Sequence, residues 1–462
     1  MSDLTFSSTS LSTDLIENLT SLGYQTMTEI QAMTIPLMLA GEDVIGQAKT
    51  GSGKTCAFGL GLLSNLNVKR FRVQSLVLCP TRELADQVAV EIRKLARNIH
   101  NIKVLTLCGG QPMGPQIGSL EHGAHIIVGT PGRVEEHVRK GRLSLAEVNT
   151  LVLDEADRML EMGFEEALDT IVSFCPEQRQ TLLFSATFPA KIERLAAHLM
   201  KAPQKVTVES THDSSSISQY FYEVEDEAQR IDAVKRLLLH FQGESAVVFC
   251  NTKAQCQQIS DTLSTFGFDS AALHGDLDQR DRDRTMIRFA NKSLSVLVAT
   301  DVAARGLDVD DLDLVINYHI AHDPEVHVHR IGRTGRAGKN GVACSLMSHK
   351  EAHKVIRLQE YLGQEFEATN LPDDSVFNNK PVKAKMVTLQ IDGGKKSKLR
   401  PGDILGALTA NPAIKGEQIG KIKVQAMASF VAVDAKISKV ALKTISDGKM
   451  KGRNFRVRLL NK

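Results

Sequence analysis

The residues from Ala48 to Thr55 have the types and spacing of a loop that binds nucleotide phosphates. They read Ala-Lys-Thr-Gly-Ser-Gly-Lys-Thr and fit the pattern G-x-x-x-x-G-K-[ST] that starts at Gly46. The glycines let backbone N–H groups surround phosphates, and the N-terminus of a following helix adds partial positive charge. We therefore predict an ATP site formed by Ala48, Thr50, Gly51, Ser52, Gly53, Lys54 and Thr55. Lys54 would reach the outer phosphates and act in catalysis, and the Thr55 hydroxyl would bind Mg²⁺.

The segments on either side of this loop are the ones that it requires. The apolar run 43–45 predicts a strand before the loop, and residues 56–66 predict a helix after it. A chance Gly-Lys turn is the alternative interpretation. The strand–loop–helix context favours the phosphate site over that alternative.

A pair of carboxylates follows another apolar strand. Residues 151–153 are Leu-Val-Leu, and Asp154 and Glu155 come directly after them. Ligands of open α/β sheets bind at the carboxyl ends of the strands, where this pair would lie. Asp154 suits Mg²⁺ held through water, and Glu155 suits the positioning and polarisation of the attacking water. A solvated acidic turn is the alternative, and the buried strand before it makes that alternative the weaker one.

Composition excludes several classes of protein. The chain has 462 residues, enough for about three domains. No run approaches the roughly 18 apolar residues of a membrane span, and the first residues lack the pattern of a signal peptide. The seven cysteines form no C-x-x-C pair, which favours reduced, buried thiols over disulfides or zinc. We expect a cytoplasmic, monomeric protein with no membrane partner.

Short apolar runs alternate with amphipathic stretches over residues 44–208, and the alternation recurs over residues 246–346. This pattern predicts parallel sheets that helices cover on both faces. The polar run 210–216 interrupts it and predicts a linker. We expect lobe 1 at 1–208, a linker at 209–217, lobe 2 at 218–366, a linker at 367–383 and a tail domain at 384–462. Two lobes of similar size suggest a cleft between them.

The end of the chain differs sharply in charge from the rest. Residues 379–462 contain 19 Lys or Arg and 5 Asp or Glu, a net charge of +14, whereas the remainder carries −12. Its apolar pattern predicts strands at 385–391, 420–424, 429–433 and 455–460, and helices at 401–410 and 437–446. The order β-α-β-β-α-β is that of small α+β ferredoxin-like domains, which include RNA-recognition modules. Together with the charge, it predicts RNA binding. A solvated lysine-rich surface and a ferredoxin-like domain that binds no RNA are the alternatives.

Nine short motifs occur in a fixed order over residues 1–362. They are Gly23–Gln31, Ala48–Thr55, Pro80–Leu84, Gly109–Gly110, Thr130–Arg133, Asp154–Asp157, Ser185–Thr187, Ala299–Asp308 and His329–Arg336. The set resembles the ordered motifs of the DEAD-box RNA helicases, and the basic tail domain adds a resemblance to the bacterial DbpA subfamily. The resemblance implies an α/β chain of two tandem RecA-like lobes followed by a small ferredoxin-like RNA-recognition domain. It also implies ATP-dependent unwinding of short RNA duplexes.

The resemblance assigns further nucleotide contacts. These are Phe6, Tyr24, Gln31 and Asp308, with Arg333 and Arg336 as catalytic arginine fingers from lobe 2. The planar amide of Gln31 matches the edge of adenine, and Asp308 would contact the ribose. Phe6 would pack near the base, with a role as a core residue as the alternative. Because the fingers lie on the lobe without the phosphate loop, we expect hydrolysis to require closure of the two lobes.

RNA contacts are implied in all three parts of the chain. They are Pro80, Thr81, Arg82, Gly110, Thr130 and Arg133 in lobe 1, Thr252, Arg280, Thr300 and Asp301 in lobe 2, and Lys395, Lys396, Arg400 and Arg453 in the tail domain. The core residues suit phosphate and sugar, so the core should read little sequence. Because the central strands of the tail offer only Phe430 for stacking, we expect its lysines and arginines to recognise RNA shape.

The subfamily resemblance implies a hairpin of 23S ribosomal RNA, in the precursor of the large ribosomal subunit, as the partner of the tail domain. Two other functions stay open at this point. One is a DNA helicase or translocase with similar lobes. The other is an ATP-gated RNA clamp that does not unwind.

Overall fold

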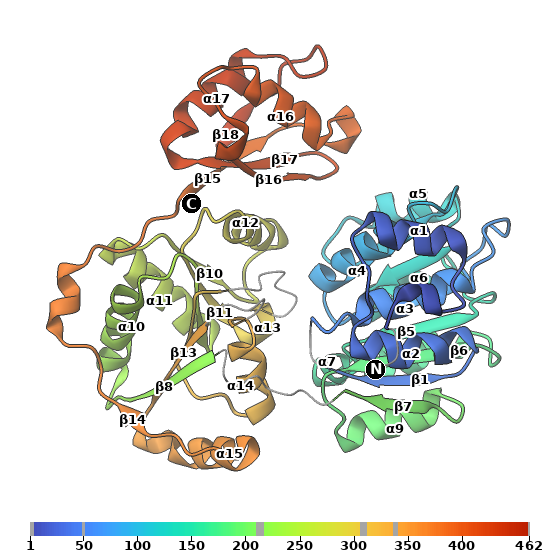
Figure 1. The fold of residues 1–462 in the computed structure, drawn as a ribbon, viewed down its shortest axis with the longest axis horizontal. Coiled ribbons are helices and arrows are strands. Elements are labelled where there is room, and N and C mark those ends of the chain that lie inside the picture. Colours follow the sequence, from blue (N-terminus) through green and yellow to red (C-terminus); the bar gives the residue numbers. More distant parts are fainter. Residues whose placement is uncertain (1–3, 49–50, 209–216, 305–311, 336–340, 461–462) are drawn as a thin grey trace. The chain divides into compact units, whose positions relative to one another are not determined.

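The computed structural model describes residues 4–48, 51–208, 217–304, 312–335 and 341–460. The chain forms two compact units, Met1–Thr211 and His212–Lys462. The first unit contains lobe 1, and the second contains lobe 2 together with the tail domain (Figure 1).

Lobe 1 is built on a seven-stranded parallel sheet with the strand order β3-β4-β2-β5-β6-β1-β7. Its strands are β1 (Val44–Gln47), β2 (Ser75–Leu78), β3 (Val104–Leu107), β4 (Ile126–Gly129), β5 (Thr150–Asp154), β6 (Gln180–Ser185) and β7 (Gln204–Thr207). Because all of them are parallel, their carboxyl ends meet at one edge of the sheet. The phosphate loop and the carboxylate pair follow β1 and β5, which β6 separates.

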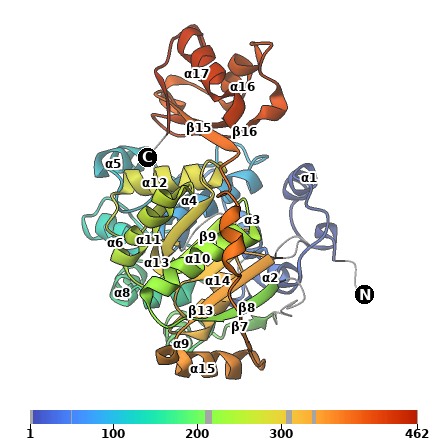
Figure 2. The same ribbon diagram turned by 90° about the vertical axis from the view of Figure 1, so that its left-hand side faces the viewer.

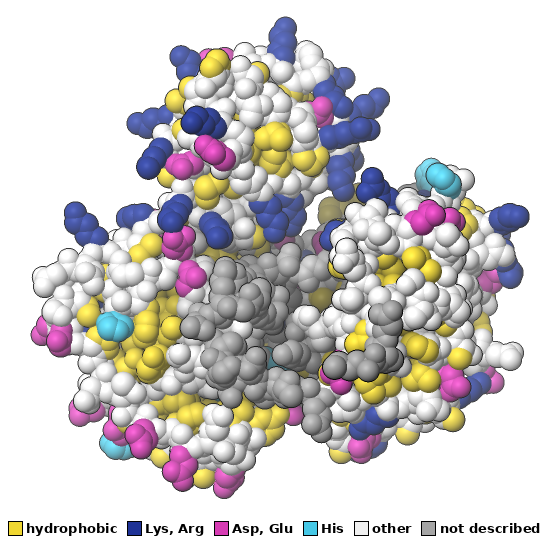
Figure 3. Space-filling model, viewed as in Figure 1, with side chains coloured by type: hydrophobic (Ala, Val, Ile, Leu, Met, Phe, Trp, Pro, Cys, Tyr) yellow, Lys and Arg dark blue, Asp and Glu magenta, His cyan; other side chains and the backbone are white. Residues whose placement is uncertain are grey.

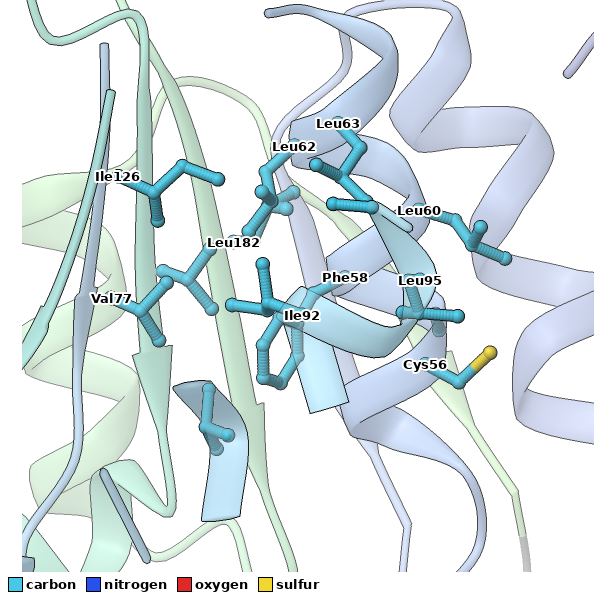
Figure 4. Packing of buried hydrophobic residues seen from close by; sticks show 14 of the residues in the cluster. Cys56, Phe58, Leu60, Leu62, Leu63, Val77, Ile92, Leu95, Ile126 and Leu182 are labelled. Atoms are coloured by element: carbon cyan, nitrogen blue, oxygen red, sulfur yellow. The ribbon is translucent and has the colours of Figure 1, made fainter. Parts of the chain in front are cut away.

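Nine helices cover this sheet within the described part of lobe 1. They are α1 (Thr13–Ser21), α2 (Glu29–Leu39), α3 (Lys54–Ser64), α4 (Arg82–Leu95), α5 (Met113–Glu121), α6 (Pro131–Arg139), α7 (Ala156–Glu161), α8 (Glu165–Ser173) and α9 (Ala190–Leu199). Two apolar clusters fill the spaces between helices and sheet. In the first, Phe58 of α3 and Ile92 of α4 face Leu182 of β6 (Figure 4). This packing fixes α3, and with it the loop that precedes α3.

Lobe 2 repeats the architecture with the parallel order β10-β11-β9-β12-β13-β8-β14. Its strands are β8 (Ile217–Glu223), β9 (Ala246–Cys250), β10 (Ser270–Leu273), β11 (Val296–Thr300), β12 (Leu314–Asn317), β13 (Gly341–Met347) and β14 (Ala368–Thr369). Its helices are α10 (Glu227–Phe241), α11 (Lys253–Phe266), α12 (Gln279–Ala290), α13 (Asp301–Ala304), α14 (Pro324–Ile331) and α15 (Ala352–Leu362). The predicted linker 209–217 lies outside the described residues except for Ile217, which begins β8.

The segment 367–383, which the sequence suggests is a linker, packs along lobe 2 instead. Strand β14 pairs with β8, and the 3₁₀ turn Asp374–Asn378 lies against α10 (Figure 1 and Figure 2). Val376 is 6% exposed within the core of lobe 2, and Arg236 pairs with Asp374 at 2.6 Å. The polar composition of the segment concealed this apolar anchor.

The tail domain is a four-stranded antiparallel sheet with the order β16-β17-β15-β18. Its strands are β15 (Met386–Ile391), β16 (Ile419–Val424), β17 (Ser429–Asp434) and β18 (Val457–Leu459), and its helices are α16 (Pro401–Thr409) and α17 (Ser438–Asp447). The predicted order β-α-β-β-α-β is confirmed. One side of the sheet packs on both helices in a separate apolar core.

The other side of the tail sheet packs on lobe 2. The hydroxyl of Thr388, on β15, bonds to Asn291 Nδ2 at 3.1 Å and to Ser293 Oγ at 2.7 Å. Phe430, on the same face of β17, forms an apolar cluster with Ile287 of α12 and with Leu460. Phe430 is 5% exposed, so its ring is not available for stacking on a base in this arrangement.

Candidate nucleotide and RNA sites

The phosphate loop has the features that bound phosphate requires. Gly51 and Gly53 have φ angles of 83° and 94°, which ordinary residues adopt only with strain. The Lys54 ammonium is buried and donates to the Ala48 carbonyl. Burial lowers the pKa of Lys54, and the charges of Asp154 and Glu155 partly oppose that effect. The buried Ser52 hydroxyl has no hydrogen-bond partner among the described residues. A nucleotide oxygen that accepts a hydrogen bond from it would satisfy this hydroxyl. Thr50 lies outside the described residues.

Gln31 lies against the phosphate loop. Its Nε2 donates to the Gly53 carbonyl at 3.1 Å, and its Oε1 accepts from the Thr28 backbone at 2.8 Å. The Thr28 hydroxyl donates to the Ser52 carbonyl at 2.8 Å. Two side chains at the start of α2 are therefore hydrogen-bonded to the phosphate loop. A nucleotide that displaces the Gln31 bond would also change how the loop is held.

The two aromatic residues assigned to the nucleotide, Phe6 and Tyr24, both make contacts within lobe 1. The ring of Phe6 is 3% exposed and belongs to an apolar core cluster, which supports its alternative role as a core residue. The Tyr24 hydroxyl donates to Glu91 of α4 at 3.0 Å. Burial, followed by the charge of Glu91, raises the pKa of Tyr24 to about 12. The hydrogen bond joins Tyr24 to α4, and Cys56 of α3, the helix after the phosphate loop, also contributes to this pKa shift.

The carboxylate pair ends β5, as the sequence predicts. Asp154 is 3% exposed, and burial together with the neighbouring Glu155 raises its pKa to about 7. A bound cation would reverse this shift by stabilising the carboxylate. The described residues contain no group of three or more His, Cys, Asp or Glu side chains that could hold a metal. Mg²⁺ does not need such a group, because it usually takes one or two protein ligands with phosphates and water. Thr55 and Asp154 fit that requirement.

A further contact links β5 to β6 at this edge. Asp157 Oδ2 accepts hydrogen bonds from the Thr187 backbone N–H at 3.1 Å and from the Thr187 hydroxyl at 2.9 Å. The Ser185 hydroxyl accepts from the Asp157 backbone at 3.4 Å. Two of the nine motifs are thereby joined directly beside Glu155.

The predicted RNA contacts of lobe 1 come together at the ends of β2, β3 and β4. Arg82 donates to the Gly109 carbonyl at 3.0 Å, and Arg133 donates to the Gln111 carbonyl at 3.1 Å. The Thr130 hydroxyl accepts from the Gly109 backbone at 3.4 Å. Gly110 has a φ of 68°, and a Cβ there would collide with the Arg82 guanidinium. Pro80 and Thr81 follow β2, where the Thr81 hydroxyl caps α4.

The predicted contacts of lobe 2 are arranged similarly. Thr252 caps α11 after β9, Thr300 ends β11, and Arg280 lies exposed in the first turn of α12. The sequence places Asp301 among the RNA contacts, and in the structure its carboxylate accepts hydrogen bonds from Arg330 at 2.6 and 2.7 Å. An anionic side chain held in this way supports neighbouring groups better than it binds RNA phosphate. Arg333 follows α14, whereas Asp308 and Arg336 lie outside the described residues.

Six basic residues of the tail domain lie around one end of its sheet. We call Lys395, Lys396, Lys398, Arg400, Lys451 and Arg453 the basic edge; all six are exposed. The turn after β15 is tied to the β16–β17 hairpin by backbone bonds from Lys395 to Gln425 and from Lys396 to Ala426, at 2.8 and 3.0 Å. Lys451 pairs with Asp403 of α16 at 3.4 Å. Figure 3 shows lysine and arginine side chains gathered over this domain.

Three family models match the chain in this order: the DEAD/DEAH box helicase at residues 28–195, the helicase conserved C-terminal domain at 229–338 and the DbpA RNA binding domain at 388–459. The ATP-dependent RNA helicase DbpA of Escherichia coli (strain K12) is 52% identical over 445 residues, which are 96% of this chain and 97% of that protein. The chain belongs to the DEAD-box ATP-dependent RNA helicases of the DbpA type.

Other known proteins match over most of this chain. CshA of Bacillus subtilis (strain 168) is 43% identical over 357 residues, 77% of this chain and 72% of CshA. A solved structure of Dbp5 from S. cerevisiae, bound to RNA and ADP BeF3, superposes with a TM-score of 0.73 at 30% identity. It covers 81% of this chain and 97% of that one. No described helix of the present structure is long and apolar enough to cross a membrane.

Sequence reasoning missed several residues of this DEAD-box helicase. Thr28 contacts the phosphate loop, and Arg330 joins three strand ends of lobe 2. Both lie within or beside motifs that the sequence displays, but their partners are distant in the chain. The docking face of α12 carried no sequence signal, because Ile287 is an ordinary apolar helix residue.

Proposed function

We propose that the tail domain targets this ATP-dependent RNA helicase to 23S ribosomal RNA during assembly of the large ribosomal subunit. The observation that carries the proposal is the basic edge: six exposed cationic side chains at one end of the tail sheet, where backbone hydrogen bonds tie the turn of Lys395 and Lys396 to the β16–β17 hairpin. An array of cations of this kind suits the phosphates of a folded RNA. The family match of the tail supports an RNA partner, and the subfamily resemblance implies ribosomal RNA.

The position of the tail sheet against lobe 2 also favours the basic edge as the RNA-binding surface, because it leaves the sheet face covered. RNA-recognition domains commonly stack bases on aromatic residues of the two central strands. Here Thr388, Phe430 and Leu460 face lobe 2, so the face that would stack bases is covered. We assign recognition to the basic edge, with Lys395, Lys396, Arg400 and Arg453 among its contacts.

We assign the catalytic roles to the residues that the sequence predicts for them. In lobe 1, Lys54 and the loop amides hold the phosphates of ATP, Thr55 and Asp154 hold Mg²⁺, and Glu155 positions the attacking water. Mg²⁺ neutralises charge on the phosphates when it is bound. Arg333 and Arg336 are assigned to charge that develops on the transferred phosphoryl group.

A salt series tests the targeting. The full-length protein is titrated into a panel of 23S ribosomal RNA hairpins and an unrelated hairpin, and the dissociation constants are measured at increasing salt. Each phosphate contact contributes about 0.7 to 0.9 to the slope of log K against log salt. We expect the doubly substituted variant Lys395→Glu, Lys396→Glu to lose affinity, salt slope and preference for its hairpin.

The matched control is Lys436→Glu, Lys439→Glu. These lysines lie beyond the other end of β17 and carry the same charge change. This control variant should lose some affinity for every RNA but keep the preference for the same hairpin. If both variants lose affinity for every RNA to the same extent, the basic edge does not select the RNA. If the wild-type protein binds no ribosomal hairpin more tightly than the unrelated hairpin, the proposed target is rejected.

A further inference from the structure

Arg330, in the last turn of α14, is one of the most fully engaged side chains of lobe 2. It is 2% exposed, and its guanidinium lies 5.3 Å from the centre of the Phe249 ring. Nε and Nη2 donate to the two oxygens of Asp301 at 2.6 and 2.7 Å. Nη1 donates to Asn317 Oδ1 at 3.3 Å and to the His319 carbonyl at 2.9 Å, and Nη2 also donates to Asn251 Oδ1 at 3.5 Å.

These contacts use all five N–H groups of the guanidinium. The bidentate pair with Asp301 is the geometry in which arginine and carboxylate bond most strongly. A phosphate of ATP or RNA could reach Arg330 only by displacing one of these acceptors, and the displacement of the buried Asn317 would leave that side chain unpaired at substantial cost. Arg330 is therefore built to hold protein groups in place.

The groups that Arg330 holds belong to three adjacent strands. Asn251 follows β9, Asp301 follows β11, and Asn317 ends β12, and these strands are neighbours in the order β11-β9-β12. Asn251 and Asp301 are the chain neighbours of Thr252 and Thr300, which we assign to the RNA strand. At its other end, Arg330 is three residues before Arg333, with the end of α14 at Ile331 between them.

We propose that Arg330 is the positioning residue that makes ATP turnover depend on RNA. RNA that binds at Thr252 and Thr300 adds a second restraint on the segment after β9 and on the start of α13 after β11. Arg330 is bonded to both segments and passes their position to α14, which places Arg333. Without RNA, the two segments lack that second restraint, and the arginine finger is held less firmly. The proposal rests on the roles assigned to Thr300 and Arg333 above.

The test measures ATP turnover of the full-length protein without RNA and over a titration of RNA. Its readouts are the activation ratio, which is turnover at saturating RNA divided by turnover without RNA, and the half-saturating RNA concentration. Arg330→Lys keeps the charge but can serve only part of the acceptor set. We expect about a tenfold loss in the activation ratio and a higher half-saturating RNA concentration, as for a lost coupling between two sites. Asp301→Asn should do the same, and the double variant should be no worse than either alone.

Arg230→Lys is the matched control. Arg230 is 3% exposed, pairs with Glu351 and donates to the Tyr318 and Leu346 carbonyls. None of these partners lies in the segment after β9 or at the start of α13. Arg230→Lys should destabilise the lobe by a similar amount and leave the activation ratio within about twofold.

An unchanged activation ratio in a folded Arg330→Lys or Asp301→Asn protein would overturn the inference, and so would an equal loss of the ratio in Arg230→Lys. If Arg330→Lys does not fold, Asp301→Asn decides, because the Asp301 side chain is 26% exposed and tolerates substitution better. A wild-type protein that no RNA activates would instead reject the assigned roles on which the inference rests.

Discussion

Replacement of Thr388 by valine should release the tail domain from lobe 2 without unfolding either one. Valine has nearly the same shape as threonine, so the change opens no cavity. It removes the hydroxyl that bonds to Asn291 at 3.1 Å and to Ser293 at 2.7 Å, at a position that is 0% exposed. The buried Asn291 amide and the half-buried Ser293 hydroxyl then lack this partner while the domains are docked, and they regain water when the domains separate.

The size of the change in docking follows from the loss of these hydrogen bonds in the docked state alone. An unsatisfied buried donor or acceptor costs about 1 to 3 kcal/mol. Such a change shifts the docking equilibrium about 5- to 150-fold. The apolar contact of Ile287 with Phe430 stays in place, so the variant weakens docking rather than abolishing it.

Amide hydrogen exchange measures docking directly. The Met386 N–H donates to the Lys292 carbonyl across the interface at 3.4 Å, so its protection reports the docked state. We expect its exchange to quicken by about 5- to 150-fold in Thr388→Val. The Leu389–Val431 pair of the inner ladder should keep its protection. Thr409→Val, which removes only a local bond to the Leu405 carbonyl, should leave Met386 unchanged. Unchanged exchange at Met386 in Thr388→Val would refute the interface.

Further predictions concern the nucleotide site, the RNA site and pH. Glu155→Gln should still bind ATP but lose RNA-stimulated hydrolysis, and a wild-type rate in a phosphate-release assay would remove Glu155 from its role. Arg336→Ala should lose turnover while keeping most ATP affinity, because a finger acts on charge that forms in the transition state; a collapse of nucleotide binding with normal single-turnover rates would contradict this. Gly110→Ala should weaken RNA binding and spare ATP binding, since a Cβ would displace Arg82; equal losses of both would argue against it. Burial raises the pKa of Glu351, but the His319 hydrogen bond and the Arg230 charge outweigh it and hold that pKa at about 2, below the ordinary 4.5. The carboxylate therefore stabilises lobe 2 fully above its ordinary pKa and loses that effect as pH falls toward 2. Denaturant titrations should show Glu351→Gln less stable by about 3 to 5 kcal/mol at neutral pH, with a gap that narrows in acid; a constant gap would contradict the pairing.

The sequence predicted the elements of the tail domain closely. Strands expected at 385–391 and 429–433 are found at Met386–Ile391 and Ser429–Asp434, because alternation of apolar residues marks a sheet with one face on a core. The fold class was predictable for the same reason: apolar strands that alternate with amphipathic helices have few other arrangements.

Features that depend on distant contacts were not predictable. The sequence places Asp301 among the RNA contacts, and only the folded sheet shows that Arg330 lies beside it. Phe6 is similar, since a lone aromatic near a binding motif can serve either a ligand or a core. Segment 367–383 is polar enough to suggest a free linker, yet Val376, Phe377 and the ion pair of Asp374 anchor its middle in lobe 2.

That anchored segment decides where the protein can be cut. Strand β8 is flanked by β13 on one side and by β14 on the other. A truncation at residue 366 would remove β14 and leave the backbone groups of β8 open to pairing with another molecule, a common cause of insolubility. It would also uncover the patch that Val376 fills. A version without the tail domain should therefore end after Asn379, whose side chain donates to the Leu239 carbonyl. Truncated proteins that end earlier are expected to aggregate, so a loss of activity in them would not measure the contribution of the tail domain.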